Sequence, residues 1–73
     1  MNPKMSQLRK KAMALPLLPG VYIMHDKGGK IIYIGKAKIL KNRVSQYFGS
    51  QNNHAEKVRR MVDNVDDFEY IIT

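Results

Sequence analysis

Two tyrosines and a group of cations are the residues of this sequence best suited to chemistry. Tyr22 lies in a short apolar run that begins at Gly20, and Tyr33 lies in a second run that ends at Gly35. Four cations follow directly: Lys36, Lys38, Lys41 and Arg43. A phenol can transfer a proton, and clustered cations can hold negative charge. This combination predicts chemistry on a phosphate.

General-base catalysis by a tyrosine needs help from its surroundings. A free phenol has a pKa of about 10, so it is a poor base at neutral pH. Nearby cations favour the phenolate, and we expect Lys36 and Arg43 to supply that field. Arg43 also suits a phosphate, because its planar guanidinium stays charged and can donate two hydrogen bonds. The alternative is that the tyrosines are ordinary strand residues and that Arg43 is a solvated helix cation.

The first half of the chain predicts a helix followed by a hairpin. We expect the helix over residues 6–15, capped by Ser6 and ended by Pro16. Strands over residues 20–25 and 30–35 flank a glycine-containing turn, and glycine supplies positive φ at little cost. Neighbouring strands would carry the two tyrosines. Whether both point from one face stays open, because a one-residue slip in register reverses a strand's faces.

The second half predicts two helices and a third strand. The first helix is expected over residues 39–48, with Leu40, Val44 and either Phe48 or Tyr47 on its buried side. The second runs to about Asn64 from a cap at Asn52 or Asn53. Its expected buried side is Ala55, Val58, Met61 and Val62. The strand covers residues 65–73 through Phe68, Tyr70 and Ile72.

These elements predict an α+β domain in the order α-β-β-α-α-β. A hairpin pairs antiparallel, so the expected product is a small three-stranded antiparallel sheet flanked by helices. A chain of 73 residues is one small domain with a limited core. We therefore expect residues 1–73 to be a piece of a longer protein, truncated at the C-terminus.

The charge of the chain is strongly one-sided. Thirteen Lys and Arg against six Asp and Glu give a net charge of +7. The segment from Lys27 to Arg43 holds no acid, and most acids follow residue 55. Such a face favours a polyanion such as nucleic acid, and the alternative is a solvated surface. The lack of cysteine, of a long apolar run and of a signal-peptide core predicts a cytoplasmic protein without membrane contact.

The two tyrosine runs and the basic segment together resemble a known nuclease family. Pro19-Gly20-Val21-Tyr22, Tyr33-Ile34-Gly35-Lys36-Ala37-Lys38 and Leu40-Lys41-Asn42-Arg43 are similar to the motifs of the GIY-YIG nuclease superfamily. Within it, they resemble the N-terminal domain of the UvrC family, the incision subunit of bacterial nucleotide excision repair. The resemblance extends from about Leu15 to Thr73. It implies the GIY-YIG fold and metal-dependent hydrolysis of a DNA phosphodiester on the 3′ side of a lesion.

The resemblance also implies roles for individual residues. Tyr33 would take a proton from the attacking water, and Tyr22 would line the same pocket. Arg43 would steady charge on the scissile phosphate, and Lys36 would lie near the phosphate or the nucleophile. The motif glycines, which serve packing and close approach more than chemistry, are Gly20 and Gly35. Lys38 and Lys41 are assigned to contacts with the DNA backbone. Such contacts position the DNA but do not read its sequence.

The family's cofactor and partners follow from the same resemblance. One divalent ion, Mg or Mn, is held by a glutamate on a helix after the third strand, which is expected beyond Thr73. Neither Glu56 nor Glu69 matches that position, so no metal ligand is assigned within this chain. We expect the parent protein to cut DNA and the isolated fragment to be inactive in a metal-dependent nicking assay. The implied partners are damaged duplex DNA, the helicase subunit UvrB and other domains of the same protein.

Other functions remain open from the residues alone. A stand-alone GIY-YIG repair nuclease or a homing-type nuclease would share the motifs but not the further domains. A noncatalytic DNA-binding module would keep the fold and the basic face. An RNA-binding or ribosomal module would follow from charge alone and would have no use for Tyr22 and Tyr33.

Overall fold

The computed structural model describes residues 2–49 and 54–73. Its elements are α1 Met5–Met13, β1 Gly20–His25, β2 Ile31–Ala37, α2 Leu40–Tyr47, α3 Glu56–Asn64 and β3 Asp67–Ile72. This confirms the α+β fold and the order expected from the sequence. No helix within these two described stretches has the length and apolar character needed to cross a membrane.

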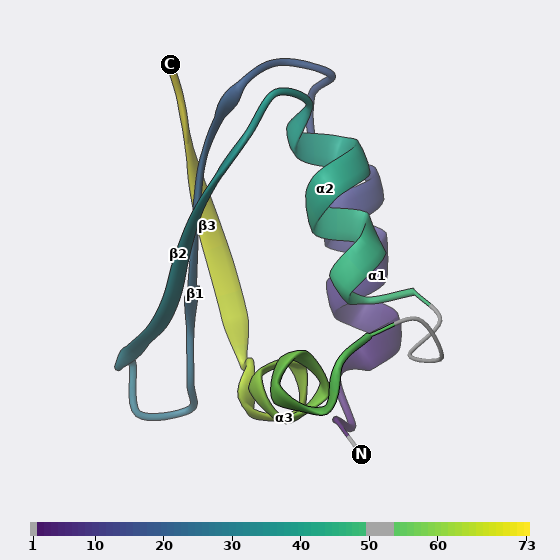
Figure 1. Cartoon of the computed structure of the whole chain (residues 1–73), viewed down its shortest axis with the longest axis vertical. Coiled ribbons are helices and arrows are strands. Elements are labelled where there is room, and N and C mark those ends of the chain that lie inside the picture. The colour runs from purple at the N-terminus through teal and green to yellow at the C-terminus, as the bar shows by residue number, and fades with distance from the viewer. Residues whose placement is uncertain (1, 50–53) are drawn as a thin grey trace.

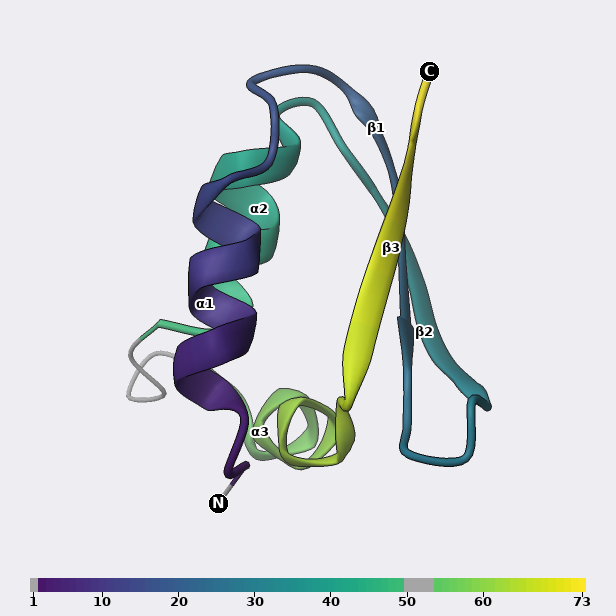
Figure 2. The ribbon, with the colours of Figure 1, turned by 180° about the vertical axis from the view of Figure 1, so that it is seen from behind.

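The sheet is antiparallel throughout, and β1 lies in its centre between β2 and β3. The helices lie on one side of the sheet, with α1 and α2 next to each other and α3 near the start of β3 (Figure 1). The view from behind shows the same two layers (Figure 2). The sheet therefore has one face turned toward the helices and one face without a covering helix among the described residues.

The register settles which face the tyrosines share. Tyr22 pairs with Gly35, and Met24 pairs with Tyr33. Residues directly opposite each other in an antiparallel pair project from the same face. Because Met24 is fully buried under the helices, Tyr22 and Tyr33 both project from the helix-covered face.

The core forms between this face and the helices. Its buried side chains from the α1 region include Leu8, Ala12 and Leu15. Those from the α2 region include Leu40 and Val44, as the sequence predicts, and both of the alternatives that it leaves open, Tyr47 and Phe48. Phe48 stacks on Phe68 of β3 with ring centroids 5.7 Å apart, which ties α2 to the sheet. This packing fixes α2 over the sheet, and it therefore also fixes where the other residues of α2 lie.

The hairpin turn has the chemistry that its sequence predicts. Gly29 adopts a φ of 82°, in the left-handed region that glycine tolerates. One Asp26 carboxylate oxygen accepts hydrogen bonds from the Gly28 and Lys30 amides at 2.9 and 3.0 Å. These bonds hold Lys30 in the turn, so β2 begins at Ile31, one residue later than expected, and continues to Ala37.

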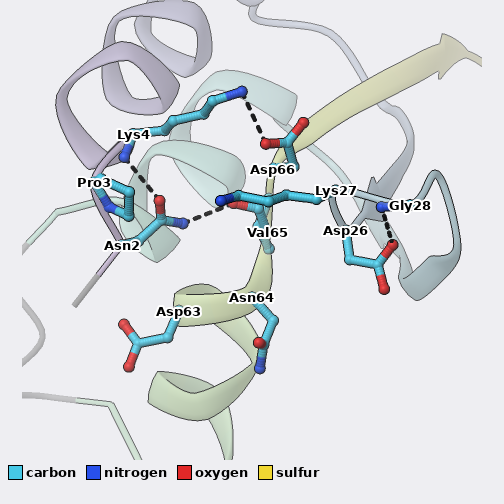
Figure 3. Close-up of a pocket in the computed structure, with 10 residues that line it drawn as sticks. All are labelled: Asn2, Pro3, Lys4, Asp26, Lys27, Gly28, Asp63, Asn64, Val65 and Asp66. Atoms are coloured by element: carbon cyan, nitrogen blue, oxygen red, sulfur yellow. Dashed lines mark hydrogen bonds and ion pairs between the residues drawn. The ribbon is translucent and has the colours of Figure 1, made fainter.

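The start of α1 differs from the expectation. Ser6 is not the cap, because the helix begins one residue earlier, at Met5. Asn2 holds the entry to the helix: its side-chain oxygen accepts a hydrogen bond from the Lys4 amide at 2.8 Å. The Asn2 side-chain nitrogen donates to the Val62 carbonyl at 2.8 Å. It also donates to the Val65 carbonyl at 2.7 Å (Figure 3). A buried asparagine far away in sequence therefore joins the N-terminus to the end of α3.

The prediction for α3 is correct in its end and wrong in part of its buried side. The expected caps, Asn52 and Asn53, lie outside the described residues, and the helix begins at Glu56. Ala55 is exposed, because it precedes the first turn in an extended conformation and leaves the helical stripe. Val62 is buried, and the two flanking apolar residues, Val58 and Met61, pack against the edge of the core.

A bridge from α1 to β3 makes stability sensitive to acid. Lys11 Nζ lies 2.6 Å from Asp67 Oδ1 and 2.6 Å from the Phe68 carbonyl oxygen. Burial raises the pKa of Asp67, but the hydrogen bonds from Lys11 and the Phe68 amide, with the charge interactions of Lys11 and His25, make the net shift downward. A carboxylate with a lowered pKa contributes stability above its unfolded pKa and loses it as pH falls through the folded value.

We predict that Asp67→Asn lowers the free energy of unfolding by about 0.2–1 kcal/mol at neutral pH, the range for exposed ion pairs. The deficit relative to the unmodified chain should begin to shrink as pH falls below about 4, the pKa of an unfolded aspartate, and should vanish below the lowered pKa of native Asp67. Urea unfolding at several pH values measures both. Asp63→Asn, in an exposed position, controls for the loss of one charge, and a deficit that is constant with pH would contradict the assignment.

Candidate active site

Three tyrosines from three elements meet on the helix-covered face of the sheet. The ring centroids of Tyr22 and Tyr33 are 6.1 Å apart, and the Tyr47 ring of α2 lies 5.7 and 6.1 Å from them. The Tyr22 and Tyr47 hydroxyl oxygens are 2.9 Å apart and share a hydrogen bond. We call Tyr22, Tyr33 and Tyr47 the tyrosine cluster.

The members of the cluster differ in their access to solvent. Tyr22 is 1% exposed and is among the most buried side chains of the core, whereas Tyr33 is 39% exposed. A general base must come within hydrogen-bonding distance of the proton that it accepts. Of these two, Tyr33 is therefore placed to meet a reactant, and Tyr22 is placed to support it from beneath.

Gly35 makes room for the Tyr22 ring. A Cβ atom at residue 35 would collide with the Tyr22 ring and hydroxyl. At the other motif glycine, Gly20, a Cβ would meet the Ile71 carbonyl oxygen and a Leu40 methyl group. Both glycines thus permit close packing, in line with the role that the sequence analysis gives them.

Arg43 stands beside the tyrosine cluster on the exposed side of α2. A side-chain hydrogen-bonding interaction with Tyr22, followed by the charge interactions with Tyr47 and Tyr22, raises the pKa of Arg43. Its guanidinium is exposed and stays charged, so it can receive a negatively charged group next to Tyr33. The structure therefore brings together Tyr22, Tyr33 and Arg43, although they are separated in the sequence.

Lys36 lies near Arg43 but starts from the other face of the sheet. It pairs with Val21 in the register, so its side chain starts from the sheet face opposite Tyr22 and Tyr33. It nevertheless lines a hollow of about 380 Å³ that it shares with Arg43, at the end of the edge strand β2. Lys38 lines the same hollow. Lys41 is half-buried on α2 and is not among the residues that line it.

Tyr47 is the site residue that the sequence reasoning missed, because it was considered only as a candidate for the buried stripe of its helix. It follows Arg43 by four residues, and residues at that spacing lie on one side of a helix. Burial is the largest cause of a raised pKa for Tyr47, followed by hydrogen bonding with Tyr22 and Tyr33. Tyr47 thus keeps its proton at neutral pH and can donate it in a hydrogen bond.

A second hollow lies away from the cluster (Figure 3). It measures about 390 Å³, and its polar lining includes Asn2, Lys4, Asp26 and Asp66. These groups already serve the fold: Lys4 Nζ is 2.8 Å from Asp66 Oδ1, Asn2 bonds to backbone carbonyls, and Asp26 forms the turn. The lining therefore favours a structural role, and the tyrosine cluster is the better candidate for chemistry.

The described part of the site offers phenols, a guanidinium and ammonium groups. Within residues 2–49 and 54–73, no group of three or more His, Asp or Glu side chains could hold a metal ion. Hard divalent cations such as Mg²⁺ prefer carboxylate and carbonyl oxygens. The cluster by itself therefore does not fit such a cation.

Comparison with known proteins identifies the family. A family model for the UvrC-like GIY-YIG domain matches residues 18–73. The chain belongs to this family. It is 63% identical over 59 residues to the UvrABC system protein C of Clostridium perfringens, covering 81% of this chain and 10% of that protein. It is 58% identical over 69 residues to the UvrABC system protein C of Lachnospira eligens, covering 94% and 11%.

Solved structures agree with this membership. The GIY-YIG N-terminal endonuclease domain of UvrC from Thermotoga maritima, bound to magnesium as its catalytic divalent cation, matches with a TM-score of 0.77 and 44% identity. The match covers 100% of this chain and 74% of that one. Point mutants of the same domain with one tyrosine replaced by phenylalanine, also bound to the cation, match equally well. The UvrC family and the GIY-YIG fold that the sequence motifs resemble are therefore confirmed. This chain spans about a tenth of the length of the curated relatives that it matches.

We predict that Gly35→Ala lowers the free energy of unfolding by about 1–3 kcal/mol, the usual cost of overpacking a core. The added methyl group would displace the Tyr22 ring and disturb its bond to Tyr47. Chemical unfolding measures the stability loss. Gly28→Ala is the matched control, because a Cβ there meets only Asp26 Oδ1, at 3.4 Å. Equal stability of the two variants would show that Tyr22 does not need the space above residue 35.

Proposed function

We propose that this UvrC-family domain is the DNA endonuclease module of an excision-repair incision subunit, cutting one phosphodiester on the 3′ side of a lesion. The proposal is carried by one observation: the exposed Tyr33 ring lies beside Arg43 and next to the buried, hydrogen-bonded pair of Tyr22 and Tyr47. Phosphodiester hydrolysis needs a group that accepts a proton and groups that hold negative charge. The cluster and its cations supply both.

In the proposed reaction, water attacks phosphorus and the bond from phosphorus to the leaving oxygen breaks. The Tyr33 phenolate accepts a proton from the attacking water and becomes a neutral phenol, and the leaving oxygen takes a proton from solvent. Arg43 holds the charge that develops on the phosphate oxygens. Lys36 contributes positive charge from the neighbouring hollow. Tyr22 and Tyr47 keep Tyr33 and Arg43 at a fixed separation through their shared hydrogen bond. Lys38 and Lys41 contact the DNA backbone.

We further propose that the reaction needs a divalent cation, Mg or Mn, whose carboxylate ligand comes from residues beyond Thr73. The support is that the Thermotoga maritima domain binds its catalytic cation in a chain longer than this one. Such a cation would neutralise charge on the phosphate and the leaving oxygen. The 73 residues alone would then position the phosphate without cutting it.

The protein partners follow from the family, whereas the DNA partner is also supported by the charge of this chain. We propose that the parent protein acts in the cytoplasm on damaged duplex DNA, delivered by the helicase subunit UvrB, with its other domains completing the contacts. The basic segment from Lys27 to Arg43 supports a DNA partner, because phosphate contacts supply most sequence-independent affinity. Stand-alone and homing-type nucleases are alternatives that use the same chemistry.

We predict that Tyr33→Phe in the longer parent chain lowers the cutting rate at saturating DNA by about 100-fold or more, because general-base catalysis typically contributes about 100- to 10,000-fold. DNA affinity should stay within about twofold, because the ring and all the cations remain. A nicking assay and a binding titration with the same duplex measure the two quantities.

Tyr70→Phe is the control for this experiment. Tyr70 pairs with Tyr22 from the opposite neighbour strand, is 42% exposed, and has no place in the proposed reaction. Its loss of a hydroxyl should leave cutting unchanged. Unchanged cutting by Tyr33→Phe would instead favour a noncatalytic DNA-binding module, with the active centre elsewhere in the parent protein.

A further inference from the structure

His54 lies against the tyrosine cluster, in the segment just before α3. Its ring centroid is 6.2 Å from that of Tyr47, at an interplanar angle of 42°. Its Nε2 atom is 2.8 Å from the Gln46 carbonyl oxygen. A carbonyl can only accept a hydrogen bond, so Nε2 carries the proton and donates it. One side chain thus contacts two consecutive residues at the end of α2.

The His54 side chain is half-buried. It lines a hollow of about 220 Å³ together with Arg43, Gln46 and Tyr47. Arg43 and Gln46 also line the hollow that contains Lys36. Arg43 therefore stands between the two hollows, and His54 forms part of the wall on the side away from the lysines.

These contacts form a continuous path from α3 to the site. The Gln46 carbonyl fixes the imidazole, the imidazole packs on the Tyr47 ring, and the Tyr47 hydroxyl is hydrogen-bonded to that of Tyr22. Tyr47 also contacts the Tyr33 ring. A catalytic group must be held close to its productive geometry, and a displacement of about 1 Å can cost about 100-fold in rate.

We propose that His54 is a positioning residue for the nuclease reaction, which holds the Tyr47 ring in place and through it the tyrosine cluster. The inference rests on the proposed function for its catalytic consequence. The contact to Tyr47 itself does not depend on that function and can be tested apart from it.

The ring is the part of His54 that the proposal requires. His54→Ala removes it, His54→Gln keeps a donor for the Gln46 carbonyl but no ring, and His54→Phe keeps a ring but no donor. In the longer parent chain we expect His54→Ala and His54→Gln to lower the cutting rate at saturating DNA by about 10-fold or more. The DNA concentration at half-maximal rate should stay unchanged, and His54→Phe should retain most of the rate.

His25→Ala is the matched control, because His25 is half-buried on β1 and contacts no member of the cluster in the described structure. It should cut like the unmodified protein. A full rate for His54→Ala would overturn the proposal. So would an effect confined to the half-maximal DNA concentration, because His54 would then contact DNA instead of positioning Tyr47.

A second measurement uses the 73-residue chain and needs no activity. With tyrosines labelled at Cζ, NMR should show that Tyr47 in the unmodified chain loses its proton at a higher pH than an ordinary phenol, whose pKa is about 10. In His54→Ala, water reaches the ring, and the pKa of Tyr47 should move toward the ordinary value. His54→Phe should restore the unmodified titration.

The two experiments separate the possible failures. If Tyr33→Phe still cuts, the proposed function fails while the Tyr47 titration still decides whether His54 shields that ring. An identical titration of Tyr47 in the unmodified chain and in His54→Ala would overturn the positioning role, whatever the activity of the longer protein.

Discussion

The hydrogen bond between the Tyr22 and Tyr47 hydroxyls is the constraint on which the rest of the site depends. It joins the central strand β1 to helix α2 inside the core, where an unpaired hydroxyl would cost about 1–3 kcal/mol. Gly35 leaves the space in which the Tyr22 ring lies. Since Arg43 precedes Tyr47 by one helical turn, fixing Tyr47 also fixes the backbone of Arg43 relative to the sheet.

The buried side chains of the site differ from the exposed ones in what they can do. Tyr22 and Tyr47 belong to the core, whereas Tyr33 and Arg43 reach solvent at the edge of the same structure. In the proposed function, this arrangement would let a DNA phosphate meet groups whose positions are set by packing rather than by loops. The cations that follow Tyr33 extend along β2 and into α2, so the electrostatic attraction leads to the place where the chemistry is proposed.

Much of this fold could be predicted because its local signals agree with one another. The strand β1, the buried stripes of α1 and α2, and the turn at Gly29 follow from apolar spacing and from glycine's freedom at positive φ. The cap of α1 could not be predicted. Asn2, which holds that end, bonds to carbonyls at Val62 and Val65, and no local pattern indicates a contact so distant in sequence.

The site was predictable to the extent that its motifs are local. The runs at Tyr22 and Tyr33 indicate a hairpin, but only the register shows that both rings share a face. The same register places the Lys36 side chain on the opposite face of the sheet, and the sequence motif alone does not indicate this. Tyr47 has the pattern of a core residue because it is buried in the core. Its contact with the site depends on the hydrogen bond to Tyr22, which lies on a strand distant in sequence.

A double-mutant cycle between Tyr22→Phe and Tyr47→Phe tests the central claim most directly. Unfolding free energies of the two single variants and the double variant would be measured in the 73-residue chain. A shared buried hydrogen bond predicts a coupling of about 0.5–1.5 kcal/mol, with the second substitution costing less once the first has been made. Additivity to within about 0.3 kcal/mol would mean that the two hydroxyls do not depend on each other, and would contradict the account.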